Sequence, residues 1–309
     1  MRIAVIGAGG VGGYFGARLA AAGHEVTFVA RGKHLEAIHR SGLSVHSPLG
    51  EFHTSPASAV PSISDLGSAD LVLIAVKLWD TEVVAEQLQA SEARQAPVLS
   101  LQNGVHKDGI LRRHVPDDQI LGGLCFISAF IEKPGVITHN SSLQKIVLGP
   151  YHASQRSISA SLVGILLDAG IDAELSADVE KAIWEKFVFL VGLSATTTTI
   201  RQPIGVIRSN KRSRQLLYDV MAEAVALAQA TGVRLDDDFA GAQLDFCDTL
   251  PVGMTSSMHN DLEKGNRLEL PWLSAGVVDL AAQQNIAVPR NRTVSDILAP
   301  YVLGRPADG

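Results

Sequence analysis

Hydrophobic residues follow two different patterns along the chain. In the first half, short runs rich in Val, Ile and Leu alternate with longer segments of helical periodicity. This alternation is typical of parallel strands joined by crossover helices and predicts an α/β fold. The runs that we expect to form strands are Ile3–Gly7, Glu25–Ala30, Leu71–Val76, Val98–Leu101, Ile120–Ile131, Gly135–His139, Lys145–Gly149 and Ile171–Leu175.

From Asp178 onward the pattern is almost wholly helical. We expect Asp178 to cap a helix at its N-terminus, with Glu180 in the first turn complementing the helix dipole. The segment that follows, to Leu193, is apolar on most faces, so this helix should be deeply buried. We therefore expect an α/β domain over residues 1–176 and an all-helical domain over residues 177–309, with the ligand cleft between them.

A glycine-rich turn directly follows the first expected strand. It reads Gly-Ala-Gly-Gly-Val-Gly and matches G-x-G-x-x-G, the phosphate-binding turn of Rossmann-type domains. In this motif Gly7 permits the tight turn, Gly9 lets a pyrophosphate approach the backbone, and Gly12 allows close packing of helix and strand. The helix N-terminus, which includes Gly10 and Val11, supplies amide donors and a positive dipole. The first domain is therefore predicted to be a Rossmann-type dinucleotide-binding domain.

The second expected strand ends in Arg31, with no acidic residue nearby in the sequence. Enzymes that use NAD usually carry Asp or Glu at this place to bind the ribose 2′-hydroxyl. A carboxylate would repel a 2′-phosphate, whereas the guanidinium of Arg31 can donate hydrogen bonds to it. The sequence therefore favours NADP as the cofactor; a solvated loop cation is the alternative interpretation of Arg31.

Four other polar residues are candidates for ligand binding or catalysis. Lys77 and Asn103 follow the third and fourth expected strands, at the ligand edge of such a sheet. Lys186 lies within an apolar helix, where a lysine must reach a surface or face a cleft. Glu269 stands between two leucines. The alternatives are a structural ion pair for Lys186 and a helix-terminal acid for Glu269.

Composition and charge argue against nucleic-acid, metal and membrane partners. The 309 residues carry a formal net charge of −6 and no stripe of Lys and Arg, which argues against a nucleic-acid partner. Cys125 and Cys247 form no C-x-x-C pattern, and the ten histidines show no ligand spacing, so we expect no metal and place His34 and His39 on a polar surface. Glycines interrupt the apolar N-terminus, and no apolar run is long enough to span a bilayer. We expect a cytoplasmic protein with no membrane partner.

The chain resembles the ketopantoate reductase (2-dehydropantoate 2-reductase) family over nearly its full length. The segments that carry the resemblance are the glycine motif with Arg31, Val76-Lys77, Gln102-Asn103-Gly104, residues 180–186, Ser257-Met258 with Asp261 and Glu269, and residues 286–291. The resemblance implies an oxidoreductase that uses NADPH to reduce a 2-oxo acid to a 2-hydroxy acid. Its first candidate reaction is ketopantoate to pantoate, in pantothenate biosynthesis.

The resemblance also implies roles for individual residues. Lys186 matches the catalytic lysine, which polarises the ketone and delivers the proton as hydride arrives. Glu269 matches the glutamate that orders the site near the cofactor, and Ser257 matches a serine that binds the substrate carboxylate. Asn103 and Ser194 also fall on the substrate side. The cofactor would be held by Gly7, Gly9, Gly10, Val11, Gly12, Arg31, Lys77, Asn103 and Glu269. A homodimer is a candidate assembly.

Four positions depart from the family pattern. Where well-known members carry asparagines, this chain has Leu190, Ser194, Ile204 and Met254. Sites of this kind discriminate through paired polar groups, so fewer amides should weaken binding of a substrate hydroxyl. A second hypothesis is therefore a reductase of a more apolar 2-oxo acid.

Two further interpretations belong to other classes. A hydroxy-acid dehydrogenase of the 6-phosphogluconate-related type would have the same domain order, but it leaves the segment from Ser257 to Glu269 unexplained. A non-catalytic NADPH-binding sensor would need neither a proton donor nor its carboxylate neighbour, so the presence of Lys186 and Glu269 argues against it.

Overall fold

The computed structural model describes residues 1–54 and 58–305. It divides into two compact units. The first consists of Met1–Asn103 and Lys107–Ala182, and the second of Gly104–His106 and Ile183–Gly309. The first is α/β and the second is helical, which confirms the expected fold class. The first unit ends within helix α6 (Val179–Ile200), and the domain limit between residues 176 and 177 stays a prediction.

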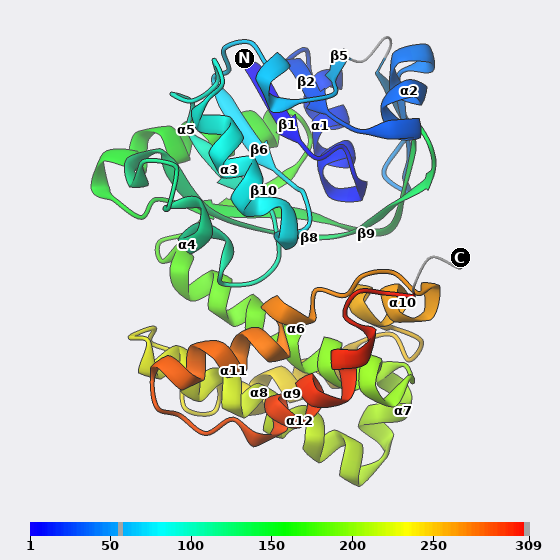
Figure 1. Cartoon of the computed structure of the whole chain (residues 1–309), viewed down its shortest axis with the longest axis vertical. Helices are drawn as coiled ribbons and strands as arrows, with labels where there is room; N and C mark the ends of the chain where they lie inside the picture. Colours follow the sequence, from blue (N-terminus) through cyan, green and yellow to red (C-terminus); the bar gives the residue numbers. More distant parts are fainter. Residues whose placement is uncertain (55–57, 306–309) are drawn as a thin grey trace. The chain divides into compact units, whose positions relative to one another are not determined.

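The first unit is built on a sheet that has ten strands in the described part of the chain. Its parallel part has the order β8-β7-β6-β1-β2-β5, with bounds Ile120–Lys133, Val98–Ser100, Leu71–Ile74, Arg2–Ile6, Glu25–Val29 and Ser58–Val60. Beyond β8 the order continues with β9 (Val136–Gly149), β3 (Leu43–His46) and β4 (Phe52–Thr54), and β10 (Asp172–Leu175) pairs with β9. The helices of this unit, seen in blue to green in Figure 1, are α1 (Gly10–Ala21), α2 (Gly32–Ser41), α3 (Thr81–Gln89), α4 (Lys107–Leu111) and α5 (Arg156–Asp168).

Both faces of the central parallel strands β1, β6 and β7 are buried. In β1, Ile3 and Val5 belong to the core that includes α1, whereas Ala4 and Ile6 belong to the core that includes α3. All four are at most 2% exposed. A strand with two buried faces needs apolar residues at successive positions, which is why these strands appear in the sequence as continuous apolar runs.

The structure confirms the expected strands and corrects their number. The strands expected at Gly135–His139 and Lys145–Gly149 form one strand, β9, and β8 extends to Lys133. The register with β8 shifts between His139 and Gln144, so the two runs form one strand with a bulge at the polar residues between them. The hairpin turns at Gly135, whose φ is +80°. Strands β3, β4 and β5 were not expected, because they are short and none forms a continuous apolar run like that of β6.

The second unit consists of helices around one apolar core. They are α6, whose last eighteen residues lie in this unit, α7 (Ile204–Ser209), α8 (Lys211–Ala230), α9 (Phe239–Thr249), α10 (Ser257–Lys264), α11 (Ser274–Gln283) and α12 (Pro289–Leu298). The carboxylate of Asp178 accepts a hydrogen bond from the Lys181 backbone N–H at 3.0 Å, which confirms the expected cap of α6. Val188 and Val191 are fully buried, which confirms the expected burial of this helix.

Helix α12 is capped from a neighbouring helix. The carboxylate of Glu223, on α8, accepts hydrogen bonds from the backbone N–H of Arg290 at 2.7 Å and of Asn291 at 2.9 Å. It also accepts one from the side-chain amide of Asn291 at 2.8 Å. These backbone donors lie in the first turn of α12, where no helical acceptor is available to them. One carboxylate therefore joins two helices of the second unit.

We expect Glu223→Ala to lower the free energy of unfolding by about 1–3 kcal/mol, because three donors lose a charged acceptor. Urea unfolding of the full chain measures this change. Glu86→Ala, at an exposed position of α3, is the control and should have a much smaller effect. A loss of stability no larger than that of the control would contradict the capping role.

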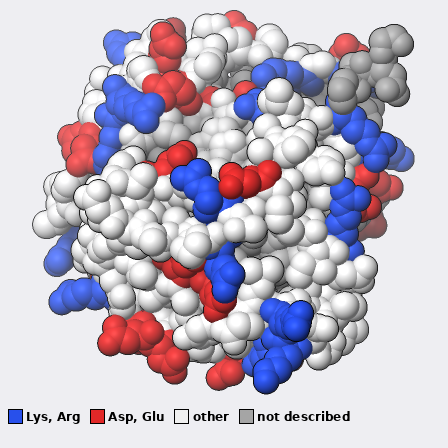
Figure 2. Space-filling view, turned by 60° about the horizontal axis from the view of Figure 1, so that its bottom comes forward, with Lys and Arg blue, Asp and Glu red and all other residues white. Residues whose placement is uncertain are grey.

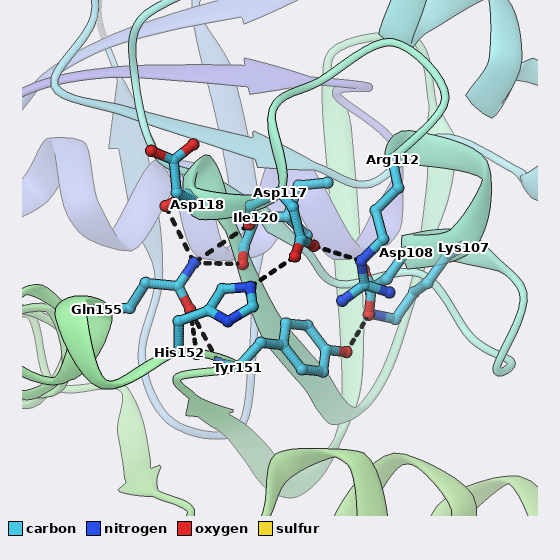
Figure 3. Close-up of polar contacts among 9 residues, drawn as sticks. All are labelled: Lys107, Asp108, Arg112, Asp117, Asp118, Ile120, Tyr151, His152 and Gln155. Carbon is cyan, nitrogen blue, oxygen red and sulfur yellow. Dashed lines mark hydrogen bonds and ion pairs between the residues drawn. The ribbon is translucent and has the colours of Figure 1, made fainter.

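A buried polar cluster lies where the chain re-enters the first unit (Figure 3). The ammonium of Lys107 contacts both carboxylate oxygens of Asp108, at 2.9 and 3.1 Å, and these side chains are 1% and 5% exposed. The hydroxyl of Tyr151 donates to the same carboxylate at 2.6 Å. Burial and the Asp108 charge raise the pKa of the Tyr151 phenol, so it remains a donor. Arg112 stacks on the Tyr151 ring, with its guanidinium carbon 4.5 Å from the ring centroid.

The residues just before this cluster belong to the second unit. The ring of His106 packs edge-on against Phe187 of α6, with the centroids 6.4 Å apart. Burial lowers the pKa of the His106 imidazole and so favours its neutral form. A side chain at Gly276 would begin 2.6 Å from this ring, so the start of α11 is packed closely against His106.

The surface carries charges of both signs. On the face drawn in Figure 2, basic and acidic side chains are mixed, and no basic stripe crosses the part of that face that is described. None of the helices in the described ranges is both long enough and apolar enough to span a bilayer.

Candidate active site

Three glycines of the turn after β1 are required by the protein's own backbone. Gly7 has a φ of +99°, and a Cβ there would lie 2.9 Å from the backbone nitrogen of Val76. A Cβ at Gly10 would lie 2.1 Å from the carbonyl oxygen of Ala129 in β8, and one at Gly12 would lie 2.1 Å from the Gly7 oxygen. These distances are far shorter than a van der Waals contact, so a larger residue would displace the turn.

Gly9 lacks a side chain for a different reason. A Cβ at this position would meet no protein atom within 4 Å. Gly9 is also the N-cap of α1, and its cap position provides no side-chain hydrogen bond. The packing of the protein therefore does not require glycine here, whereas a phosphate lying against the backbone would. Together with the amide donors in the first turn of α1, this geometry fits the pyrophosphate of a dinucleotide.

Arg31 has an acidic neighbour that the sequence analysis missed. Its side chain is 76% exposed at the start of α2, and its guanidinium lies 3.0 Å from the carboxylate of Asp80. The expectation that no acid lies near Arg31 is correct along the chain and wrong in space. Asp80 closes the short 3-10 helix that follows Lys77. The signal was available, because the carboxyl ends of parallel strands meet at one sheet edge.

A buried glutamine links the strand ends that carry Lys77 and Asn103. The side-chain amide of Gln102 donates to the Val76 carbonyl at 3.0 Å and to the Thr81 hydroxyl at 2.8 Å. Lys77 directly follows Val76, and Asn103 directly follows Gln102. The structure therefore brings the backbones of these two predicted residues together at the carboxyl edge of β6 and β7. Lys77 is half-buried, with its ammonium 5.8 Å from the centroid of the Trp79 ring.

Lys186 lies on α6 in the second unit. It is half-buried, next to the fully buried Phe187, whose ring packs edge-on against Trp184 at 5.6 Å. Leu190 and Ser194 follow at intervals of four residues, so they share its helical face. Leu190 is half-buried, whereas Ser194 is fully buried and its hydroxyl has no hydrogen-bond partner in the described part of the protein. A substrate role for Ser194 stays a prediction.

Ser257 is held by contacts between α10 and α6. The buried Ser256 caps α10 by accepting a hydrogen bond from the His259 backbone N–H at 3.0 Å. Its hydroxyl also lies 2.9 Å from the hydroxyl of Thr197, and the His259 imidazole bonds the Thr197 carbonyl at 2.8 Å. These bonds join the two helices and leave Ser257, the first residue of α10, exposed. An exposed hydroxyl at a helix N-terminus can donate to a carboxylate.

Glu269 is half-buried between the buried Leu268 and Leu270. It occupies the N-cap position of the 3-10 helix Leu270–Trp272, but its side chain makes no capping bond there. The position therefore agrees with a helix-terminal acid, whereas the side chain does not act as the cap.

No group of three or more His, Cys, Asp or Glu side chains in the described ranges is placed to hold a metal ion. Cys125 and Cys247 are both buried and are not joined in a disulfide. Burial also raises the pKa of the Cys247 thiol to about 11. A thiol with this pKa is protonated near neutral pH and is a poor nucleophile.

Known proteins match the chain over both units. Residues 3–153 match the family described as ketopantoate reductase PanE/ApbA, and residues 178–302 match the family of its C-terminal domain. A 2-dehydropantoate 2-reductase of Halobacterium salinarum is 30% identical over 299 residues, which are 96% of this chain and 98% of that protein.

Solved structures show the same fold. A PanE/ApbA family ketopantoate reductase from Ralstonia eutropha is 32% identical with a TM-score of 0.89, covering 97% of this chain and 98% of that one. A D-mandelate dehydrogenase solved with NADH and anilino(oxo)acetate has a TM-score of 0.89 at 21% identity, with coverage of 97% and 98%. At that identity the similarity shows the fold alone.

The sheet, the glycine turn and the matches to ketopantoate reductases together define an oxidoreductase with a dinucleotide-binding domain. Since the matching regions include most of both units, the chain belongs to the ketopantoate reductase family.

Proposed function

We propose that the protein reduces 2-dehydropantoate (ketopantoate) to pantoate with NADPH, as a step in pantothenate biosynthesis. One observation carries the proposal: the family match extends over both units, and Lys186, Ser257 and Glu269 stand at the positions that the resemblance assigns to catalysis and substrate binding. The relative from Halobacterium salinarum is named as a 2-dehydropantoate 2-reductase.

In the proposed reaction, a hydride for C2 of the 2-oxo acid would come from NADPH bound at the glycine turn. The ammonium of Lys186 donates a hydrogen bond to the ketone oxygen and transfers its proton there as negative charge develops. The product is a 2-hydroxy acid, and water then reprotonates Lys186. Ser257 and the first-turn amides of α10 would receive the substrate carboxylate, with Asn103 orienting the substrate and Glu269 ordering the site.

Several residues of the first unit would hold the cofactor. Gly7, Gly9, Gly10, Val11 and Gly12 form the turn that fits the pyrophosphate. The 2′-phosphate of NADPH is assigned to Arg31, and Lys77 and Asn103 to the nicotinamide side. The Asp80 carboxylate beside Arg31 neutralises part of its charge, so it reduces the preference for a phosphate over a hydroxyl.

We expect Arg31→Ala to raise the KM for NADPH about 10- to 100-fold, because a hydrogen bond to a charged group contributes about 1.5–3 kcal/mol. The KM for NADH should change less than about twofold, since NADH has no 2′-phosphate. Asp80→Asn is the paired variant and should lower the KM for NADPH. Equal effects of Arg31→Ala on both cofactors would show that Arg31 does not bind the 2′-phosphate.

A second substrate class has one observation in its favour. Leu190 and Met254 keep partly exposed apolar side chains where family members carry asparagines. The backbone N–H of Ile204 donates to the Met254 carbonyl at 2.9 Å, so two of the substituted positions are adjacent. Ile204 itself is fully buried and acts through packing. These features are the ground for a second candidate substrate class, the apolar 2-oxo acids.

Steady-state kinetics decide between the two substrates. NADPH oxidation is measured with ketopantoate, 2-oxoisovalerate, 2-oxoisocaproate and phenylglyoxylate at equal protein concentration. We expect the highest kcat/KM for ketopantoate. A kcat/KM at least tenfold higher for one of the apolar acids would assign the second class, and no turnover with any of them would contradict a reductase of 2-oxo acids.

A further inference from the structure

His34 makes two hydrogen bonds that connect distant segments of the first unit. Its Nε2 lies 2.8 Å from the carbonyl oxygen of Ala8, inside the glycine turn. Its Nδ1 accepts a hydrogen bond from the backbone N–H of Gly135, at the turn between β8 and β9, at 3.1 Å. The imidazole is half-buried, and both of its ring nitrogens are bonded to backbone groups.

These two bonds define which nitrogen of the imidazole carries the proton. The Gly135 N–H can only donate, so Nδ1 must accept and carries no proton. Nε2 therefore carries the proton and donates it to the Ala8 carbonyl, which can only accept. Burial lowers the pKa of His34 and favours this neutral form. The ring thus acts as a fixed link between the hairpin turn and the glycine turn.

The bond to Ala8 also sets the direction of the next amide. A trans peptide is planar, so the Ala8 carbonyl and the Gly9 N–H point in opposite directions. With the carbonyl held by His34, the Gly9 N–H points away from His34. Gly9 is the residue whose missing side chain leaves space at the turn. The His34 bond therefore orients the amide that is available to a phosphate.

The same residue connects the two phosphate sites of the proposed cofactor. His34 lies in the first turn of α2, three residues after Arg31, which is the N-cap of that helix. On the other side of the turn, Gly10 touches the backbone of β8 at Ala129. The glycine turn is therefore held by β8 and by His34. Because His34 and Arg31 both belong to the start of α2, the His34 bond also connects the glycine turn to the segment that carries Arg31.

We propose that His34 is a positioning residue for the dinucleotide: its neutral imidazole holds the Ala8 peptide so that the Gly9 amide faces the pyrophosphate. The proposal rests on the dinucleotide-binding part of the proposed function. His34 touches neither substrate nor reacting atoms, so its loss acts on cofactor binding and not on the chemical step.

The test compares His34→Ala, His34→Gln and His39→Ala. His39 lies on the same helix and bonds a carbonyl outside the glycine turn, that of Ala59 at 2.7 Å, so it is the matched control. The Kd for NADPH and for NADH is measured by fluorescence titration well below the melting temperature of each variant. The kcat is measured with saturating NADPH and 2-oxo acid.

We expect His34→Ala to raise both Kd values about tenfold, as the loss of one well-placed hydrogen bond would, while kcat stays within about threefold. His34→Gln keeps an N–H donor and should recover most of the affinity, and His39→Ala should bind like the wild type. A folded His34→Ala variant with wild-type Kd values would overturn the proposal, as would equal loss of affinity in His34→Ala and His39→Ala.

The wild-type measurements separate this inference from the proposed function. If the wild type binds NADH and not NADPH, the proposed cofactor is wrong, but the NADH comparison still decides the role of His34. If the wild type binds either cofactor and reduces no 2-oxo acid, the proposed reaction is wrong, and the Kd values again decide the role of His34.

Discussion

Replacing Lys186 by methionine is expected to lower kcat with ketopantoate about 10²- to 10⁴-fold, the usual contribution of a positioned proton donor. Methionine keeps the length and apolar stem of the side chain, so the buried neighbours Trp184 and Phe187 should pack as before. The Kd for NADPH should change little, because the residues proposed to hold its phosphates belong to the first unit. Stopped-flow reduction under single-turnover conditions measures the chemical step directly.

Two variants make the Lys186 result specific. Lys186→Arg keeps the positive charge, but a guanidinium does not release its proton in proteins. We therefore expect it to preserve substrate binding better than Lys186→Met without restoring kcat. Lys211→Met, at the exposed start of α8, removes a lysine elsewhere and should leave kcat unchanged. If Lys186→Met kept more than a tenth of the wild-type kcat, the lysine would not be the proton donor.

Lys107→Met is expected to lower the free energy of unfolding by about 3–5 kcal/mol, because it leaves the buried Asp108 carboxylate without its cation. The hydroxyl of Tyr151 would still donate to Asp108, which limits the loss but does not neutralise the charge. Urea unfolding of the full chain, followed by circular dichroism, measures the change.

The control for Lys107 removes the polar groups of Lys107, Asp108 and Tyr151 together. In the triple variant Lys107→Met/Asp108→Leu/Tyr151→Phe no buried charge or hydroxyl remains at this place. Apolar groups of similar volume often replace a buried ion pair without loss of stability. We therefore expect the triple variant to be more stable than Lys107→Met. A triple variant no more stable than Lys107→Met would show that the loss comes from packing and not from the unpaired charge.

Local patterns predicted the parts of the fold that depend on local sequence. The apolar runs of β1, β6 and β7 are visible because both strand faces are buried. The start of α6 was predictable because Asp178 needs only the amide three residues later. In contrast, His139 is 2% exposed within β9, and its ring lies 4.6 Å from the ring of Tyr14. The burial of His139 was not predictable, because a histidine gives no hydrophobic signal in the sequence.

In the candidate site, too, some features follow from local sequence and others depend on contacts between distant segments. The glycine turn was predictable from its G-x-G-x-x-G spacing after an apolar strand. The backbone that excludes a side chain at Gly7 and Gly10 belongs to Val76 and Ala129, which are distant in the sequence. The pairing of Arg31 with Asp80 was predictable only from the sheet edge at which their strands end. The bonds of His34 join segments far apart in the sequence, and no spacing rule reveals them. Ser194 shares a helical face with Lys186, but a helical period says nothing about how deep each position lies.

The assignment of Gly104–His106 to the second unit has a practical consequence for dissecting the gene. A fragment that stops before Ile183 would contain His106 without Phe187, and would expose more of an imidazole that is half-buried in the full chain. The complementary fragment would lack these three residues and leave Phe187 and Gly276 uncovered. Neither half would be a complete folding unit, so truncated proteins are poor substitutes for the full chain, and the two halves should be exchanged between relatives together with this short segment.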